Sequence, residues 1–104
     1  MNLGVEICKY SKLAAEHNLV FGAGGNISAR PRGSDTFFIS ATNKSLYGLM
    51  PEELVEVKVE DGLPVSKEGL KPSKEAGMHA AIYRKRSLTS EEVYRREFLI
   101  TLRK

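Results

Sequence analysis

The stretch GAGGNISAR, residues 22–30, contains the first predicted strand and the glycine-rich loop before it. Three glycines precede the alternating run NISAR. Alternation with a period of two indicates a β-strand, with Ile27 and Ala29 turned toward the core and the polar residues turned outward. The glycines are either a simple turn or a loop whose backbone N–H groups converge on an anion. The stretch by itself leaves both interpretations open.

A helix precedes this stretch, and further strands follow it. Residues 2–18 carry apolar side chains at the three- and four-residue spacing of an amphipathic helix. Pro31 ends the first strand, and the turn RGSD leads into a second strand at 36–40, so we expect these two strands to pair antiparallel. Valines that alternate with charged residues predict a third strand at 55–59.

The remaining elements are short. Residues 51–53 predict one helical turn that begins on proline, and a turn signal before 63–66 allows a hairpin return. Ser73 is a suitable N-cap for a helix that ends on cations at 84–86. The capping box TSEE begins a last amphipathic helix at 89–103. The order of elements predicts an α+β fold, α/β/α layered, with helices packed on a mostly antiparallel sheet.

Size and composition indicate one soluble domain. The chain has 104 residues, of which 41% are hydrophobic and 28% charged. Cys8 is the only cysteine, so an intramolecular disulfide is excluded and a reducing compartment is expected. Its place beside an apolar helix stripe predicts a buried, inert thiol. Neither a secretory leader nor a membrane-spanning segment is evident, so we expect a cytoplasmic protein without a membrane partner.

Charge is uneven along the chain. Residues 1–70 hold seven basic and nine acidic side chains, whereas residues 71–104 hold nine and four. A basic end can indicate nucleic-acid binding. Here Glu91–Arg95 and Glu92–Arg96 stand at i,i+4 spacing and largely neutralise each other on a helix. A solvated helix face is therefore favoured, and nucleic acid is not expected as a partner.

Three polar loops adjoin the predicted strands: GAGGNIS, ATNKS at 41–45 and KPSKE at 71–75. Glycine-rich bends and a helix N-terminus both present backbone N–H groups to an anion. A single loop of this kind is more often just a turn. Together the three loops predict a phosphate site, if the fold brings them close. Side chains that could donate to it are Asn26, Ser28, Thr42, Lys44, Ser45, Lys71 and Ser73.

Glu75 lies in the first turn of the helix that Ser73 caps. The helix dipole there stabilises its carboxylate, which could then accept a proton. The alternative is an ordinary helix-stabilising acid. His79, four residues on, is expected to be a core or hydrogen-bonding histidine. With one cysteine and two distant histidines, the sequence shows no spacing typical of zinc ligands.

In this order, GAGGNIS, FFISATNKSLYGLMPEELVEV and GLKPSKEAGMHAAIYRKR resemble the N-terminal half of the class II aldolase/adducin family. The resemblance covers roughly residues 3–86. The family includes zinc-dependent sugar-phosphate aldolases, a ribulose-phosphate 4-epimerase and the non-catalytic head of adducin. It implies a lyase or epimerase that acts on a sugar phosphate, with zinc polarising the carbonyl.

The resemblance also assigns roles to residues. It implies that Glu75 is the catalytic acid/base and that the three loops hold the substrate phosphate. Asn43 stands where the family usually has glycine, and Asn tolerates left-handed geometry better than most residues. Lys74 replaces a usual second serine and would lower the basicity of Glu75. The implied phosphate-binding residues are Gly25, Asn26, Thr42, Asn43, Ser73 and Lys74.

After Arg86 the sequence departs from the family pattern. The family continues into a strand with a His-x-His pair and has a third zinc-binding histidine further on, none of which occurs in residues 87–104. We therefore expect a family-like portion at 1–86 and a divergent C-terminal helix at 87–104. The first hypothesis is a shortened zinc-dependent ketose 1-phosphate aldolase, inactive alone, which self-associates or needs a complementary chain. The alternative is a non-catalytic phosphate-binding or adducin-like scaffold module.

Overall fold

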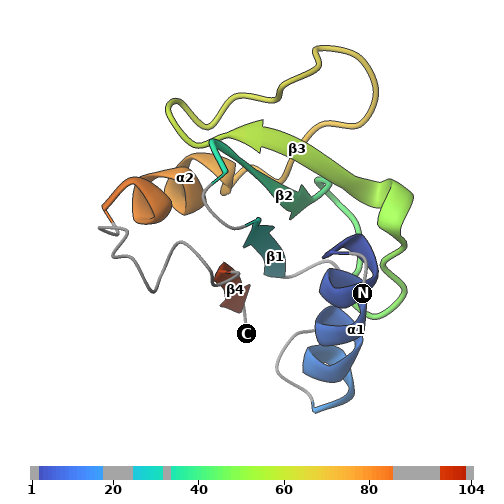
Figure 1. Cartoon of the computed structure of the whole chain (residues 1–104). Helices are drawn as coiled ribbons and strands as arrows, with labels where there is room; N and C mark the ends of the chain where they lie inside the picture. The colour runs from blue at the N-terminus through green and yellow to red at the C-terminus, as the bar shows by residue number, and fades with distance from the viewer. Residues whose placement is uncertain (1–2, 18–24, 32–33, 86–96, 103–104) are drawn as a thin grey trace.

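The computed structural model describes residues 3–17, 25–31, 34–85 and 97–102, the last range through its backbone alone. Figure 1 shows the arrangement of the elements along the chain. They are α1 (Leu3–Glu16), β1 (Gly25–Arg30), β2 (Thr36–Ser40), the 3-10 turn η1 (Pro51–Glu53), β3 (Leu54–Lys58), α2 (Ala76–Lys85) and β4 (Glu97–Leu102).

The four strands form one antiparallel sheet in the order β3-β2-β1-β4. Ser28 lies opposite Ile39 on β2, and Ile39 lies opposite Val55 on β3. The alternating patterns in the sequence predicted β1, β2 and β3 to within one residue at each end. The predicted antiparallel pairing of β1 with β2 is confirmed as well.

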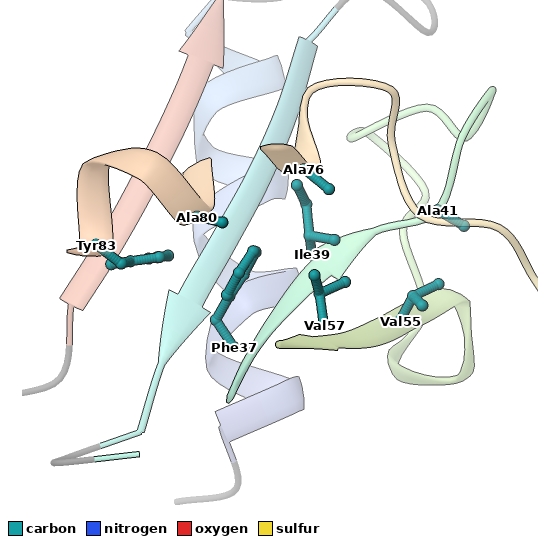
Figure 2. Close-up of a cluster of buried hydrophobic side chains, with 8 residues drawn as sticks. All are labelled: Phe37, Ile39, Ala41, Val55, Val57, Ala76, Ala80 and Tyr83. Atoms are coloured by element: carbon teal, nitrogen blue, oxygen red, sulfur yellow. The ribbon is translucent and has the colours of Figure 1, made fainter. Parts of the chain in front are cut away.

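The sheet is covered on both faces. On one face, Ile27 and Ala29 of β1 pack with Ile7 of α1 and with Leu46 and Leu49 from the loop after β2. The opposite face carries the larger cluster (Figure 2), in which α2 covers β2 and β3. Its members are Phe37, Ile39, Ala41, Val55, Val57, Ala76, Ala80 and Tyr83. The predicted α+β fold with α/β/α layers is confirmed.

The polar residues of β1 differ from the prediction. Asn26, Ser28 and Arg30 were expected to face solvent, but they are 3%, 0% and 5% exposed. The period-two pattern located the strand correctly and gave the wrong environment for its second face. The reason is α2, which covers that face, so the polar side chains of β1 must find partners within the protein.

The predicted C-terminal helix is wrong for residues 97–102, which form β4. This strand pairs with β1 through six residue pairs, from Gly25 opposite Leu102 to Arg30 opposite Glu97. The capping box that suggested the helix lies in residues 86–96, outside the described part of the chain. EFLITL is rich in residues favourable for strands, and the edge of β1 offers it a full ladder of backbone partners.

The shorter predictions are mostly confirmed. Residues 51–53 form the predicted helical turn. The chain returns beside β3 as expected for a hairpin, although only through an isolated bridge between Val57 and Pro64. Within the described ranges, none of the helices is long and apolar enough to cross a membrane.

Candidate functional site

The second and third polar loops are joined by backbone hydrogen bonds. Thr42 N–H donates to the carbonyl of Lys71 at 2.9 Å, and Ser73 N–H donates to that of Ser40 at 3.0 Å. Between these bonds, Ala41 and Pro72 form an isolated antiparallel bridge. The end of β2 and the start of the α2 segment therefore lie side by side.

The start of β1 completes the arrangement. β1 and β2 run antiparallel, so Gly25 and Asn26 lie at the edge of the sheet where β2 ends. Ser40 Oγ accepts a hydrogen bond from Ile27 N–H at 3.2 Å and ties the two strands together there. The described part of the first loop, from Gly25 on, thus meets the other two predicted loops at one end of the sheet.

A hollow of about 120 Å³ lies between them. This volume is far below the roughly 300–1,000 Å³ of pockets that enclose a whole drug-sized molecule, and it suits a small polar group. All six residues predicted to contact phosphate line it. The complete lining is Gly25, Asn26, Ala41, Thr42, Asn43, Lys44, Ser73 and Lys74.

Two of the lining residues have left-handed backbone geometry. Gly25 has a φ of 139° and Asn43 a φ of 61°. Only glycine adopts the first conformation readily, and Asn is among the few other residues that tolerate the second. The replacement of the family's glycine by Asn43 is therefore compatible with the loop geometry.

Glu75 lies beside the hollow rather than in its wall. Asn26 Nδ2 donates to Glu75 Oε2 at 2.9 Å, and Glu75 N–H donates to Ser73 Oγ at 3.2 Å. The second bond lies in the turn before α2, which begins at Ala76, so Glu75 stands just before the helix and not in its first turn as predicted. Asn26 is buried, and its Oδ1 accepts no hydrogen bond from the described part of the chain. Among the described residues, Glu75 is therefore the hydrogen-bond partner that orients the side-chain amide of Asn26.

Two lysines lie at the rim of the hollow, and one of them is paired with a carboxylate. Lys74 is exposed, whereas Lys44 Nζ lies 3.2 Å from Glu53 Oε2. The N–H of Met50 is the main cause that lowers the pKa of Glu53, and Lys44 adds to the effect. Sequence analysis named Lys44 among the possible anion donors but not among the six phosphate-binding residues. Its position next to Asn43 could have predicted that it lines the hollow. Ser45 and Lys71 do not line the hollow.

Ser28 was a candidate donor to the anion, and the structure places it elsewhere. Its Oγ is hydrogen-bonded to His79 Nδ1 at 2.6 Å and to Tyr83 Oη at 2.8 Å. Burial is the main cause that lowers the pKa of His79, and the nearby Glu75 carboxylate partly opposes it. Arg30 stacks over the Tyr83 ring, with its guanidinium carbon 5.2 Å from the ring centre. The prediction of a hydrogen-bonded core histidine is confirmed.

Zinc, which the resemblance implies, does not fit the residues described. In the ranges 3–17, 25–31, 34–85 and 97–102, no three His, Cys, Asp or Glu side chains come together as a metal site would require. His79 also directs one ring nitrogen at Ser28.

A second hollow lies at the other end of β1 and is larger, about 660 Å³. Its lining includes Arg30, Lys58, Val59 and Arg84. Gly25 and Arg30 are separated by the length of the strand, roughly 16 Å at 3.3 Å per residue. None of the residues predicted for the phosphate site lines this larger hollow.

The family follows from comparison with known proteins. The model of the class II aldolase and adducin N-terminal domain matches residues 5–89. The chain therefore belongs to the class II aldolase and adducin family, and the resemblance drawn from the three loops is confirmed.

Two relatives carry specific names. A methylthioribulose-1-phosphate dehydratase of Leptospira biflexa serovar Patoc is 39% identical over 80 residues, which cover 75% of this chain and 38% of the relative. A 5-deoxy-D-ribulose 1-phosphate aldolase of Bacillus thuringiensis serovar kurstaki is 38% identical over 81 residues, which cover 78% of this chain and 37% of the relative.

Solved structures agree with this assignment. An L-fuculose 1-phosphate aldolase matches with a TM-score of 0.71 and 28% identity, over 82% of this chain and 39% of its own. The L-fuculose 1-phosphate aldolase of Thermus thermophilus matches with a TM-score of 0.60 and 25% identity, over 76% and 38%. The chain thus spans less than two fifths of the length of these proteins.

Proposed function

We propose that this chain forms the phosphate-binding part of a ketose 1-phosphate lyase. The observation that carries the proposal is the meeting of three separate loops around one small hollow with Glu75 beside it. In this proposal the hollow holds the phosphate of the substrate. Glu75, the carboxylate beside it, transfers a proton at the adjoining carbon skeleton.

Each wall of the hollow supplies a different kind of contact. Gly25 allows close approach to the backbone, since no Cβ blocks an incoming oxygen. Thr42 and Ser73 offer hydroxyl groups, and the start of α2 adds the positive end of its dipole. Lys44 and Lys74 add positive charge, which strengthens hydrogen bonds to an anion.

The hollow is too small for a whole sugar phosphate, so the sugar would extend past it toward Glu75. Binding by the phosphate fixes the carbon skeleton relative to the carboxylate, and this positioning lowers the entropic part of the barrier. In the family, zinc supplies polarisation of the substrate carbonyl. The residues of this chain bind the phosphate, hold Glu75 and provide the group that moves the proton.

The names of the relatives support the substrate class more strongly than the reaction. The two relatives and the L-fuculose enzymes are all named for ketose 1-phosphates. Their reactions differ, because a dehydratase breaks a carbon–oxygen bond and an aldolase a carbon–carbon bond. We therefore propose a ketose 1-phosphate as ligand, with aldol cleavage as the reaction to test first.

The alternative is a phosphate-binding or adducin-like interaction module without chemistry. It is favoured by the lack of a zinc-type group among the described residues. The alternative keeps the hollow and its anion but gives Glu75 only a structural role at the start of α2. Self-association or a complementary chain is compatible with either proposal.

The binding step is tested by calorimetric titration of the 104-residue chain with L-fuculose 1-phosphate and with unphosphorylated L-fuculose. We expect binding of the phosphate ester only. Thr42→Val removes the hydroxyl at nearly constant volume and should weaken binding about 10- to 150-fold, as for loss of one hydrogen bond to a charged group. Equal binding of both sugars would contradict the phosphate site.

A matched control and an assay for chemistry complete the test. Thr36→Val alters a threonine at the other end of the sheet, outside the hollow, and should leave affinity unchanged. An assay for dihydroxyacetone phosphate then distinguishes the lyase, which would release it from L-fuculose 1-phosphate, from the interaction module, which would not. Cleavage that is lost in Glu75→Gln supports the lyase, whereas phosphate binding without cleavage supports the interaction module.

A further inference from the structure

Asn26 connects the hollow to Glu75. It lines the hollow, and its Nδ2 donates to Glu75 Oε2 at 2.9 Å. Glu75 itself is not part of the lining. With only 3% of its surface exposed, Asn26 is enclosed by protein and has little freedom to leave this position. It is thus the contact between the anion site and the carboxylate that would transfer a proton.

We propose that Asn26 is a positioning residue through which an anion in the hollow raises the affinity of Glu75 for a proton. The inference rests on the proposed function, which places an anion in the hollow and a proton-transferring role on Glu75. It adds that the two events are coupled, so that binding of the phosphate prepares Glu75 to take up a proton.

The coupling follows from what the amide does in the free protein. A hydrogen bond from Asn26 to the ionised carboxylate favours the charged form of Glu75. An oxyanion that enters the hollow competes for the same amide, and its negative charge repels the Glu75 carboxylate. Both effects favour the protonated form. Because linkage is reciprocal, the anion must then bind more tightly when Glu75 is protonated.

Other charged groups near Glu75 do not reproduce this effect. Lys44 and Lys74 at the rim are basic side chains, which favour the ionised form of a nearby carboxylate and not the protonated one. His79 lies one turn further along α2, and its pKa is lowered mainly by burial. On the other edge of β1, Gly25 and Asn26 pair with Leu102 and Thr101 of β4, and neither residue type is ionisable.

The test uses sulfate, which stays doubly charged over the pH range in which carboxylates titrate and therefore adds no titration of its own. The pKa of Glu75 is measured by NMR from its carboxyl carbon in wild type and in Asn26→Ala. Without sulfate, we expect a higher pKa in Asn26→Ala, by roughly 0.5–1 unit, because the donor to the ionised form is lost. With saturating sulfate, we expect the pKa to rise in both proteins, and by more in wild type.

The outcomes separate this inference from the proposed function. An identical Glu75 pKa in the two sulfate-free proteins would overturn the inference. Sulfate binding with equal pKa increases in both would also overturn it, while leaving the anion site intact. Failure of wild type to bind sulfate would overturn the proposed site and, with it, the coupling. Glu68, an exposed carboxylate in the loop before α2, is the control and should not shift.

A second measurement keeps the inference testable if Asn26→Ala does not fold. Glu75→Gln keeps the shape of the side chain and removes its titration. The side-chain amide signal of Asn26 in wild type should move with pH at the pKa of Glu75, and this movement should be absent in Glu75→Gln. A signal that moves identically in both proteins would overturn the inference.

Discussion

Ser28 Oγ and His79 Nδ1 lie 2.6 Å apart in the interior, between β1 and α2. The same hydroxyl is hydrogen-bonded to Tyr83 Oη at 2.8 Å, and none of the three side chains is more than 1% exposed. A fully buried polar network of this kind stabilises a fold only while all its members have partners. It ties the second face of β1 to the helix that begins beside the hollow.

Removal of the central hydroxyl should therefore destabilise the protein. Ser28→Ala leaves His79 Nδ1 and Tyr83 Oη without this partner, and we expect a loss of about 1–3 kcal/mol in the free energy of unfolding. Urea titration measures it. Ser66→Ala, in an exposed loop, is the matched control and should change stability by no more than about 0.5 kcal/mol. Equal effects from the two substitutions would show that the network contributes little.

The same network makes stability depend on pH. Burial lowers the pKa of His79 below its ordinary value of 6.5, so protonation favours the unfolded chain. The stability gained from a neutral His79 is complete above the unfolded pKa and is lost as the pH falls through the folded pKa. Unfolding measured at about pH 7.5 and 5.5 should show this loss, and it should shrink in His79→Asn. An unchanged loss in the variant would assign it to other groups.

Local patterns in the sequence predicted most of the fold, because strand alternation and helix spacing are local signals. They predicted β2 at its observed residues, 36–40. They failed where distant segments decide the structure. The burial of Ser28 depends on α2, and the conformation of residues 97–102 depends on pairing with β1. A capping box and an apolar helix face favoured a helix there. Both are local signals and carry no information about pairing with the distant strand β1.

The candidate site, like the fold, could be predicted from the sequence only in part. The resemblance to the family assigned six residues to phosphate binding, and the structure brings all six around one hollow. Their contact with phosphate remains a prediction. Sequence reasoning could not show that Ser28, two residues from Asn26 and on the same face of β1, is hydrogen-bonded to His79 and does not line the hollow. The i,i+4 spacing of His79 and Tyr83 was the one local hint that a polar partner lay opposite α2.

Glycine positions offer a pair of opposite predictions. Gly77, early in α2, has an open space where a Cβ would lie, so Gly77→Ala should stabilise the protein by about 0.4–1 kcal/mol. Gly62 has a φ of 74°, and a Cβ there would lie 3.0 Å from Gly77 Cα. Gly62→Ala should therefore destabilise by about 1–2 kcal/mol. Thermal unfolding distinguishes the two directions, and a shift of the same sign in both would contradict this geometry.

Cys8 should react slowly with alkylating reagents. Partial burial is the main cause that raises the pKa of its thiol, and Glu52 and Glu53 raise it further. Since the thiolate is the reactive form, alkylation by iodoacetamide near neutral pH should be slower in the folded protein than in concentrated urea. Glu52→Gln removes one nearby negative charge and should increase the folded rate slightly. A folded rate equal to that in urea would contradict the protection of this thiol.

Metal analysis tests whether the chain alone can hold the zinc that its family implies. The described residues bring no three His, Cys, Asp or Glu side chains together, and Ser28 occupies one nitrogen of His79. We therefore expect the purified 104-residue chain, after dialysis against zinc and then against buffer, to retain far less than one equivalent. Elemental analysis gives the content, and unfolding measured with and without a chelator gives an independent readout. Because a metal bound only to the folded state stabilises it, a chelator should leave the unfolding midpoint unchanged. Stoichiometric zinc whose removal lowers that midpoint would contradict the prediction.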